Sequence, residues 1–365
     1  MRSGPKPIPP GYSEGQLLSR IRSYKLARKY NNVLLSYIAG DPVAMAESLA
    51  FNQTLGFAGS GPLGPETKHY VDFYRENRDL FVGTRDAATV AVLRSYPSIT
   101  YDQPRVQLST ILVKQALIQA RIPFDLVFDE HLADLSRYRA LVLPDTECLS
   151  DTQLASIRRF VTTGGGLVAT GQAGLYDQWR RLRVEPGLHG MIDSQSPARA
   201  YEERVAPIAA NGEIVRKGYD EGRVAYVPEI AFDGTLPQFG SFFPVDARFW
   251  RAPRNAADIA DTVRWAARER IPVEVSGPDC LVSNLVEHPE KHRIILHLVN
   301  YNARKEASLG NVHATFRLPS GESVKEAVLY SPDYSGPRRL AAIEGDAFAT
   351  FCVPVKTYSI VAVTW

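Results

Sequence analysis

The middle of the chain alternates short apolar runs with one amphipathic segment. Residues 140–143 (ALVL) are wholly apolar, as in a parallel strand covered on both faces, and residues 166–169 (GLVA) repeat the pattern after a gap of helix length. In the gap, Ser150 or Asp151 can serve as N-cap, and glycines 164–166 supply a left-handed C-cap and a tight turn. Apolar residues recur at helical spacing between them: Leu154, Ile157, Phe160 and Val161. This pattern predicts a β-α-β unit.

The same rhythm continues on both sides of this unit. Further buried strands are predicted at 89–93, 125–128 and 222–227, with helices along 108–118 and 256–268. Strands that alternate with helices in this way are typical of an α/β domain with a parallel sheet. We therefore predict a flavodoxin-like domain over residues 85–270, with ligands expected beyond the carboxyl ends of its strands, at 144–148 and 170–174.

The two ends of the chain have different patterns. After residue 271 short strands follow one another without helices, which predicts a small antiparallel β-sandwich over 271–365. The predicted strands are 293–300, 315–318, 324–330, 348–353 and 358–363. Residues 1–84 show helical patterns at 17–38 and 43–51, a Gly- and Pro-rich loop at 56–65, and no strand-like run.

Composition and charge exclude several classes of protein. The 365 residues are 45% hydrophobic and 22% charged, with a formal net charge of +2, which is ordinary for a globular chain. Dispersed Lys and Arg residues give no reason to expect nucleic acid or a membrane as partner. The N-terminus has no apolar run of a secretory signal, so we expect a cytoplasmic protein. Cys148, Cys280 and Cys352 lie far apart and predict neither disulfides nor a zinc site.

A nucleophile is sought first in an α/β domain, at the sharp turn after a strand. The chain contains neither GxSxG nor SxxK, and the turn after the fourth strand reads Ala-Thr-Gly-Gln, with Thr170 at its elbow. Thr170 lacks an evident adjacent base. Cys148 near His131 is the other candidate, although a buried structural thiol is the favoured interpretation. We predict no metal site and no cofactor, and His297, inside an apolar strand, is interpreted as a core histidine.

Carboxylates offer a second kind of chemistry. Asp145 and Glu147 follow the third predicted strand, where a ligand crevice is expected, and we take them as candidate catalytic residues. Glycoside hydrolysis needs two such carboxyl groups on opposite sides of the scissile bond. Asp102, Asp129 and Glu130 can approach from neighbouring loops. The alternative is that these acidic residues cap helices or are solvated.

Aromatic residues could supply stacking surfaces for a sugar. Trp179, Phe249 and Trp250, with Phe242 and Phe243, lie in Gly- and Pro-rich surroundings, and packing between domains explains them equally well. As candidate substrate-binding residues we take Gln172, Trp179 and Trp250.

Residues 138–177 (YRALVLPDTECLSDTQLASIRRFVTTGGGLVATGQAGLYD) resemble the β-galactosidase trimerisation domain of family 42 and related glycoside hydrolases. That domain is similar in fold to class I glutamine amidotransferases but lacks their nucleophilic Cys, and here too Thr170 and Gly171 occupy the elbow. The resemblance extends to SYKLARKYNNVLLSYI and MAESLAFNQTLG, which look like closing helices of a catalytic barrel. LHLVNYN and the later strands resemble the C-terminal β domain.

The resemblance implies a β-galactosidase-like protein that acts on β-galactosides if it is catalytically competent, and that assembles as a homo-oligomer, with a trimer as the first expectation. In the family the catalytic glutamates stand on barrel strands, and the sequence before residue 80 is too short to hold a barrel, so no residue here matches them. The alternative is a non-catalytic oligomerisation or carbohydrate-binding module derived from a barrel glycosidase.

Overall fold

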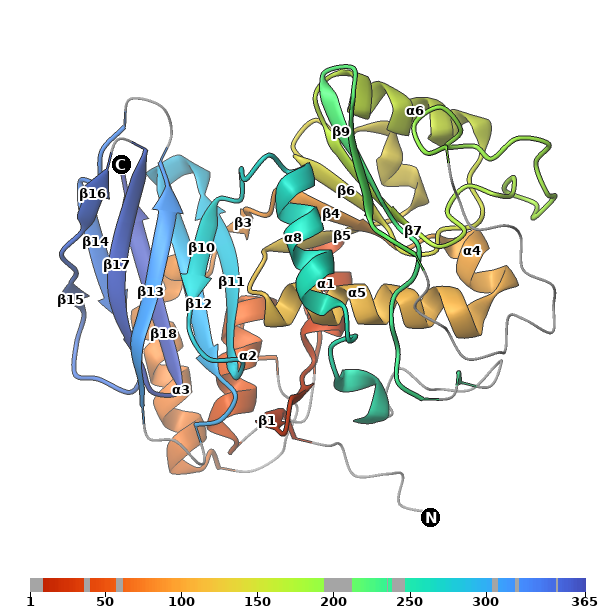
Figure 1. The fold of residues 1–365 in the computed structure, drawn as a ribbon. Helices are drawn as coiled ribbons and strands as arrows, with labels where there is room; N and C mark the ends of the chain where they lie inside the picture. The colour runs from red at the N-terminus through yellow and green to blue at the C-terminus, as the bar shows by residue number, and fades with distance from the viewer. Residues whose placement is uncertain are drawn as a thin grey trace, which may run out of the picture. The chain divides into compact units, whose positions relative to one another are not determined.

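The computed structural model describes residues 9–35, 40–56, 62–193, 212–234, 236–237, 247–303, 308–318, 322–345 and 347–365. These residues form two compact units, and Figure 1 shows the helices and strands of each. Residues 88–120 and 124–271 form the α/β unit. Residues 1–87, 121–123 and 272–365 form the sandwich unit, so the two predicted end segments pack together. The three-part division of the chain at residues 84 and 270 stays a prediction.

The α/β unit is built on one six-stranded sheet in the order β5-β4-β6-β7-β9-β8. The first five strands are parallel and follow the flavodoxin order, and β8 adds an antiparallel edge. The predicted flavodoxin-like fold is confirmed. The strands are β4 (Val90–Leu93), β5 (Phe124–Val127), β6 (Ala140–Leu143), β7 (Gly166–Thr170), β8 (Val215–Tyr219) and β9 (Gly222–Val227).

Helices cover both faces of this sheet, which explains why its central strands are apolar throughout. The buried face of α6 (Asp151–Thr162) packs in one core cluster with alternate residues of β4, β6 and β7. Helices α5 (Leu108–Gln119) and α8 (Ala256–Ala266) pack together, and α8 also contacts β6, β7 and β9. The shorter elements are α4 (Tyr96–Tyr101), the π-helix η2 (Gln103–Gln107) and the 3-10 helices η3 (Asp129–Ala133) and η5 (Ala247–Trp250).

Both ends of α6 match the predicted punctuation. The Ser150 hydroxyl accepts from the Gln153 backbone N–H at 3.2 Å, and the Gln153 side chain accepts from the Ser150 N–H at 2.8 Å, which is a complete capping box. At the other end Gly164, with φ of +104°, donates to Val161, and the next residue donates to Phe160. These are the two bonds of a Schellman motif, so glycine turns the chain toward β7.

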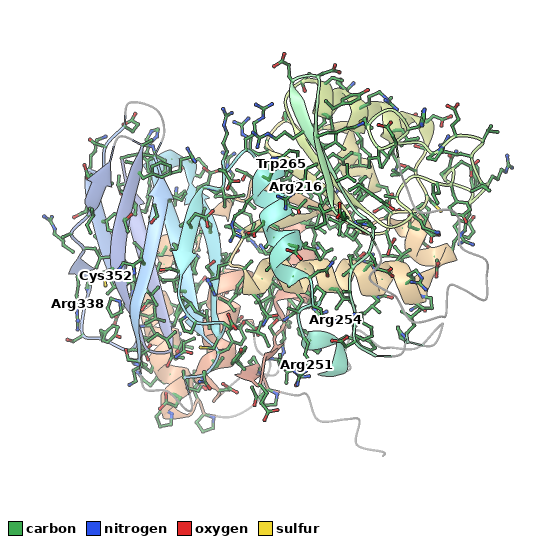
Figure 2. All side chains as sticks on the ribbon, viewed as in Figure 1. Arg216, Arg251, Arg254, Trp265, Arg338 and Cys352 are labelled. Carbon is green, nitrogen blue, oxygen red and sulfur yellow. The ribbon has the colours of Figure 1, made fainter. Side chains whose placement is uncertain are left out.

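Arginine stacking fastens the edge hairpin to α8. The guanidinium carbons of Arg216 on β8 and Arg223 on β9 lie 6.0 and 5.1 Å from the ring centroid of Trp265. Arg223 also donates to the Trp265 carbonyl at 2.8 Å, and Figure 2 labels Arg216 and Trp265. These contacts pack two arginines of the edge hairpin against Trp265 of α8.

The sandwich unit contains two antiparallel sheets, in the orders β10-β13-β17-β16 and β15-β14-β18-β12-β11-β3, with one apolar core between them. The predicted sandwich is confirmed. Its strands are β3 (Arg85–Asp86), β10 (Val273–Ser276), β11 (Leu281–His288), β12 (Arg293–Asn300), β13 (Leu309–Arg317), β14 (Glu326–Tyr330), β15 (Arg338–Arg339), β16 (Ile343–Gly345), β17 (Phe348–Val355) and β18 (Tyr358–Thr364). A 3-10 turn, η6 (Pro289–Lys291), joins β11 and β12.

Helices from the start of the chain cover the outer face of the second sheet. They are α1 (Ile21–Lys29), α2 (Pro42–Asn52), α3 (Pro65–Glu76) and the 3-10 turn η1 (Arg78–Leu80), preceded by the hairpin β1 (Gly11–Ser13) and β2 (Gln16–Leu18). Leu296 and Leu298 point into the sandwich core, whereas His297 between them faces α2 and lies within 3.4 Å of Gln53. His297 is fully buried and its Nδ1 lies 2.8 Å from the Tyr358 hydroxyl, which confirms a core histidine.

The predicted helix over 17–38 is wrong in extent. Residues 16–18 pair in a hairpin, because Glu14 and Gly15 take positive φ and turn the chain. The helix then spans only Ile21–Lys29, since Asn31 takes a left-handed backbone with φ of 55°. Residues 36–38 lie outside the described part of the chain. The second helix, predicted at 43–51, is confirmed as α2.

In the described ranges no helix has both the length and the apolar character needed to cross a bilayer. Cys148 and Cys280 are buried free thiols, and Cys352 on β17 is an exposed one (Figure 2).

We predict that the stability of the sandwich unit depends on the ionisation of Glu47. This carboxyl on α2 is buried and accepts from the Tyr301 hydroxyl and the Arg20 backbone N–H, both at 2.7 Å. Burial raises the pKa of Glu47 from 4.5 to about 7. The folded chain therefore binds more protons than the unfolded chain in this window, so the free energy of unfolding falls as pH rises, by about 3 kcal/mol in total.

Urea unfolding at a series of pH values from 4.5 to 8 measures this dependence in the parent and in Glu47→Gln. The difference between the two curves should follow the titration of one carboxyl. Parallel curves would show that Glu47 has no raised pKa.

Candidate functional site

The candidate site lies at the carboxyl edge of the parallel sheet, where strand order reverses. β4 lies between β5 and β6, so the segments after β4 and β6 leave the sheet at its switch point. In doubly wound folds ligands bind in the crevice at this point. Here α4, which follows β4, and the segment 144–149, which follows β6, come together: the Ser98 hydroxyl accepts from the Cys148 backbone N–H at 3.0 Å.

Asp145 is buried and joins two loops. Its side chain accepts from the Ser109 hydroxyl at 2.6 Å and from the Gln172 backbone N–H at 3.0 Å, and its own N–H donates to the Thr170 hydroxyl at 2.9 Å. Its backbone has φ of +43°. A Cβ at Gly171 would lie 1.7 Å from the Asp145 carboxylate, so the close approach requires glycine. This geometry gives Asp145 a structural part in holding the turn after β7.

Glu147 is buried beside a second carboxyl and one arginine. Arg180 donates to Glu147 at 3.0 Å and lies 4.0 Å from Asp102, and its guanidinium carbon is 5.0 Å from the ring centroid of Tyr176. Burial, together with the negative charge of Asp102, raises the pKa of Glu147. Among the described residues, the Oε1 atom of Glu147 has no hydrogen-bond partner.

The two candidate nucleophiles are buried. Burial and the neighbouring Glu147 raise the pKa of Cys148 to about 12, so the thiolate is scarcely populated at neutral pH. His131, its suggested partner, instead accepts from the Phe128 backbone N–H at 3.2 Å. The Thr170 hydroxyl accepts a hydrogen bond from the Asp145 backbone N–H. Neither residue has the geometry of an activated nucleophile.

Backbone hydrogen bonds join the loops after β6 and β7. The N–H groups of Gly174, Tyr176 and Leu149 donate to the carbonyls of Thr146, Glu147 and Tyr176 at 2.8, 3.0 and 3.1 Å. The two loops therefore continue the pairing of the sheet beyond its strands. Asp145, Glu147 and Gln172 belong to these two loops, and each is at most 4% exposed.

The predicted sugar-binding residues lie on separate segments. Gln172 is buried and contacts Asp145 through its backbone N–H. Trp179 is next to Arg180 and its side chain is 63% exposed. Its backbone N–H donates to the Asp177 carboxylate. Trp250 is half-buried in η5, and Phe249 beside it is buried and stacks on Phe232 with ring centroids 5.5 Å apart. Phe242 and Phe243 lie outside the described residues.

The remaining candidate carboxylates have local roles. Asp129 accepts from the Tyr96 backbone N–H at 2.7 Å and from the Gln153 side chain at 3.3 Å, so it joins the starts of α4 and α6. Glu130 is exposed, 3.7 Å from His131. Of the three neighbouring carboxylates proposed from sequence, only Asp102 approaches Glu147. Across the described ranges, no group of three His, Cys, Asp or Glu side chains is placed to hold a metal.

Arg180 is the residue that sequence reasoning missed. It lies 33 positions after Glu147, in a loop with no strand or helix pattern, and no spacing rule connects the two. The only available signal was general: buried carboxylates require a partner.

A comparison with protein-family models matches residues 114–195 to the β-galactosidase trimerisation domain. The range begins within α5 and contains β5, β6, α6, β7 and the loop that follows, and thus the whole Glu147–Arg180 pair. The predicted resemblance is confirmed, and the chain contains a domain related to those of glycoside hydrolases. A comparison with curated protein sequences finds no match.

Solved structures of glycosidases share the fold. α-L-Fucosidase isoenzyme 2 from Paenibacillus thiaminolyticus aligns with a TM-score of 0.59 at 18% identity, over 94% of this chain and 62% of that one. The β-galactosidase from Rahnella sp. R3 gives 0.59 at 14% identity, over 94% and 56%. A GH42 β-galactosidase from G. stearothermophilus gives 0.51 at 15% identity, over 82% and 44%. The chain thus spans less than two thirds of each of these structures.

We predict that Arg180→Met destabilises the α/β unit in a pH-dependent way. The change leaves the buried Glu147 carboxylate without its cation, which costs about 3 kcal/mol where the carboxyl is ionised. At lower pH Glu147 accepts a proton and the cost shrinks. Urea unfolding at pH 6 and pH 9 should therefore show the larger loss at pH 9.

Arg181→Met, at the exposed neighbouring position, is the control and should be near neutral at both pH values. Adding Glu147→Gln to Arg180→Met should remove most of the pH dependence. An equal loss at both pH values would argue against Glu147 as the partner whose charge makes Arg180 necessary.

Proposed function

We propose that the α/β unit is the assembly domain of a β-galactosidase-like protein and that this chain forms homotrimers through it. The observation that carries the proposal is the match of residues 114–195 to a family described by its trimerisation. Assembly through this unit needs an exposed apolar surface, because the burial of apolar area favours association. The matched range contains such a surface.

The surface is the tip of the loop after β7, where Trp179, Leu182 and Val184 are exposed. Trp179 is 63% and Leu182 61% accessible, and Val184 is fully exposed. Three large apolar side chains within six residues are unusual on a surface that stays in water. We call these three residues the apolar loop tip.

The apolar loop tip is held in a fixed conformation before any partner arrives. The N–H of Asp177 donates to the Arg181 carbonyl and that of Arg183 to the Leu175 carbonyl, both at 3.0 Å, which forms a small hairpin. Arg183 also pairs with Asp151 at 2.7 Å. A preordered loop loses little entropy on association, which favours a protein interface.

The burial of the two candidate catalytic carboxylates supports assembly over catalysis. Asp145 and Glu147 are each at most 4% exposed, and Asp145 accepts hydrogen bonds from the Ser109 hydroxyl and the Gln172 backbone N–H. We propose the cytoplasm as the compartment, which agrees with three free thiols.

We predict that the purified chain has three times the 40.5 kDa mass of one chain in size-exclusion chromatography with light scattering. Leu182→Asp combined with Val184→Asp should weaken association at least about tenfold, because it puts charge into the buried centre of the interface. The matched control is Ile343→Asp, at a 76% exposed apolar position on β16, which should leave the mass unchanged. A monomeric parent would overturn the proposal.

A second candidate function is glycoside hydrolysis at the carboxyl edge, with Glu147 as the general acid, Asp145 as the second carboxylate, and Gln172, Trp179 and Trp250 contacting a β-galactoside. The raised pKa of Glu147 favours it, since a general acid must hold its proton at neutral pH.

Hydrolysis of nitrophenyl β-galactoside by the parent, Asp145→Asn and Glu147→Gln separates the two functions. If the chain serves assembly alone, all three proteins release nitrophenol at the background rate. Turnover by the parent that falls at least about 100-fold in folded Glu147→Gln would instead assign catalysis to this edge.

A further inference from the structure

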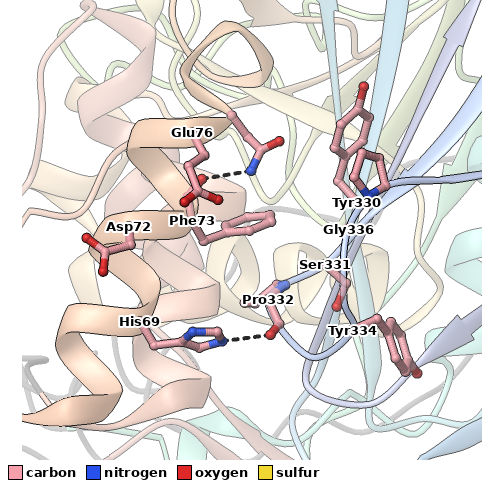
Figure 3. A pocket seen from close by; sticks show the side chains of 11 residues that line it. His69, Asp72, Phe73, Glu76, Tyr330, Ser331, Pro332, Tyr334 and Gly336 are labelled. Carbon is pink, nitrogen blue, oxygen red and sulfur yellow. Dashed lines mark hydrogen bonds between the residues drawn. The ribbon is translucent and has the colours of Figure 1, made fainter.

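The sandwich unit contains a cavity of about 490 Å³ between α3 and the segment that follows β14 (Figure 3). This volume is typical of small-molecule sites. Every residue that lines it precedes position 78 or follows position 329, so the cavity is outside residues 114–195. It is therefore separate from the edge discussed above.

One part of the lining is aromatic. Phe73 of α3, with Tyr330 and Tyr334, supplies rings to the cavity (Figure 3). Phe73 is nearly buried and packs edge-on against Tyr358, with ring centroids 6.3 Å apart, which fixes its position. The Arg338 guanidinium lies 4.8 Å from the ring centroid of Tyr334 and supports that ring.

The other part of the lining is rich in hydrogen-bond acceptors. Asp72 and Glu76 of α3 line the cavity, together with Asn77, which caps the end of this helix. The Asn77 amide donates to the Phe73 carbonyl at 2.9 Å, which leaves its side-chain oxygen as an acceptor. Within the described ranges, the Glu76 carboxylate and the hydroxyls of Tyr330 and Tyr334 make no hydrogen bond to protein.

The loop side of the cavity is rigidly held. The His69 Nε2 atom lies 2.7 Å from the Pro332 carbonyl, so it carries the hydrogen and bridges α3 to the loop. Ser331 donates to the Tyr358 carbonyl at 2.6 Å, and Asp333 accepts from the backbone N–H groups of Thr357 and Tyr358 at 2.8 and 2.9 Å. These bonds prearrange the site for a ligand.

We propose that this cavity binds a neutral carbohydrate. Sugar hydroxyls donate to carboxylate and amide oxygens, while the C–H face of a pyranose packs on an aromatic ring. The two carboxylates disfavour anionic ligands. Lys68 hydrogen-bonds Asp72 and lowers its pKa, and Arg75 lies 4.0 Å from Asp72, so the charge of Asp72 is balanced. Among the described residues of the lining, Glu76 is then the carboxylate that keeps an unpaired negative charge.

The proposal goes beyond assembly and does not rest on it. Binding is measured by isothermal titration calorimetry and saturation-transfer NMR on the full chain, with galactose, glucose, mannose, fucose and lactose as probes. We expect dissociation constants on the order of 1 mM for at least one sugar, as for a shallow site with few contacts. Tyr334→Ala should weaken binding at least about tenfold, and Glu76→Gln should weaken it several-fold.

Two matched controls lie elsewhere in the same unit. Phe348→Ala removes a ring that, like Tyr334, packs against an arginine, here Arg317 at 4.7 Å from the ring centroid. Glu344→Gln neutralises a carboxylate that is exposed like that of Glu76. Both should bind sugar like the parent, and thermal unfolding verifies that all variants fold. Failure of every sugar to bind the parent would overturn the proposal, as would equal binding by Tyr334→Ala. Tetramethylammonium binding without sugar binding would assign the cavity to cations instead.

Discussion

The constraint on which both units depend is that each main sheet buries both of its faces. In the sandwich unit, Leu296 and Leu298 face the other sheet while His297 faces α2, so β12 has no side that tolerates water. α2 covers this face of the sheet, and almost all of its residues are buried. Polar contacts hold the helix in place, among them the hydrogen bond from the Tyr301 hydroxyl to Glu47. The N-terminal helices are consequently part of the β-sandwich in energetic terms, although the strands β10 to β18 all follow residue 272 in the chain.

At the carboxyl edge of the parallel sheet, polar side chains are buried as well, and their burial limits the chemistry of this edge. Strand ends in doubly wound folds leave polar groups around a crevice, and an open crevice offers these groups to a ligand. Here Asp145 bonds Ser109 and the Gln172 backbone, and Arg180 pairs with Glu147, so both carboxylates already have partners within the chain. Such a network stabilises the loops only while each member keeps its partner. The edge thereby becomes a rigid base for the exposed loop above it.

The sequence predicted those elements whose pattern is local and strong. The run at 140–143, the strand at 222–227 and the caps of α6 were all found at their observed positions, because burial on both faces and capping each leave a signature within a few residues. β8 lies at a sheet edge, and its exposed and half-buried residues form no apolar run that would predict a strand. The pair Glu147–Arg180 leaves no local sequence pattern either. Sequence position correctly placed Asp145 after a strand. It could not reveal that the side chain turns inward, since that depends on Gly171 approaching from another loop.

The apolar loop tip and the cavity beside α3 belong to different parts of the chain. The apolar loop tip lies inside residues 114–195, where the family match gives an independent reason to expect association. The cavity beside α3 lies outside that range, so its ligand is argued from Tyr334, Glu76 and Asn77 alone. The helix and the loop that line it come from opposite ends of the chain, and no local pattern could have shown them to be neighbours. A family match can thus identify one unit of a chain, while a cavity in the other unit is formed by residues whose proximity only the fold creates.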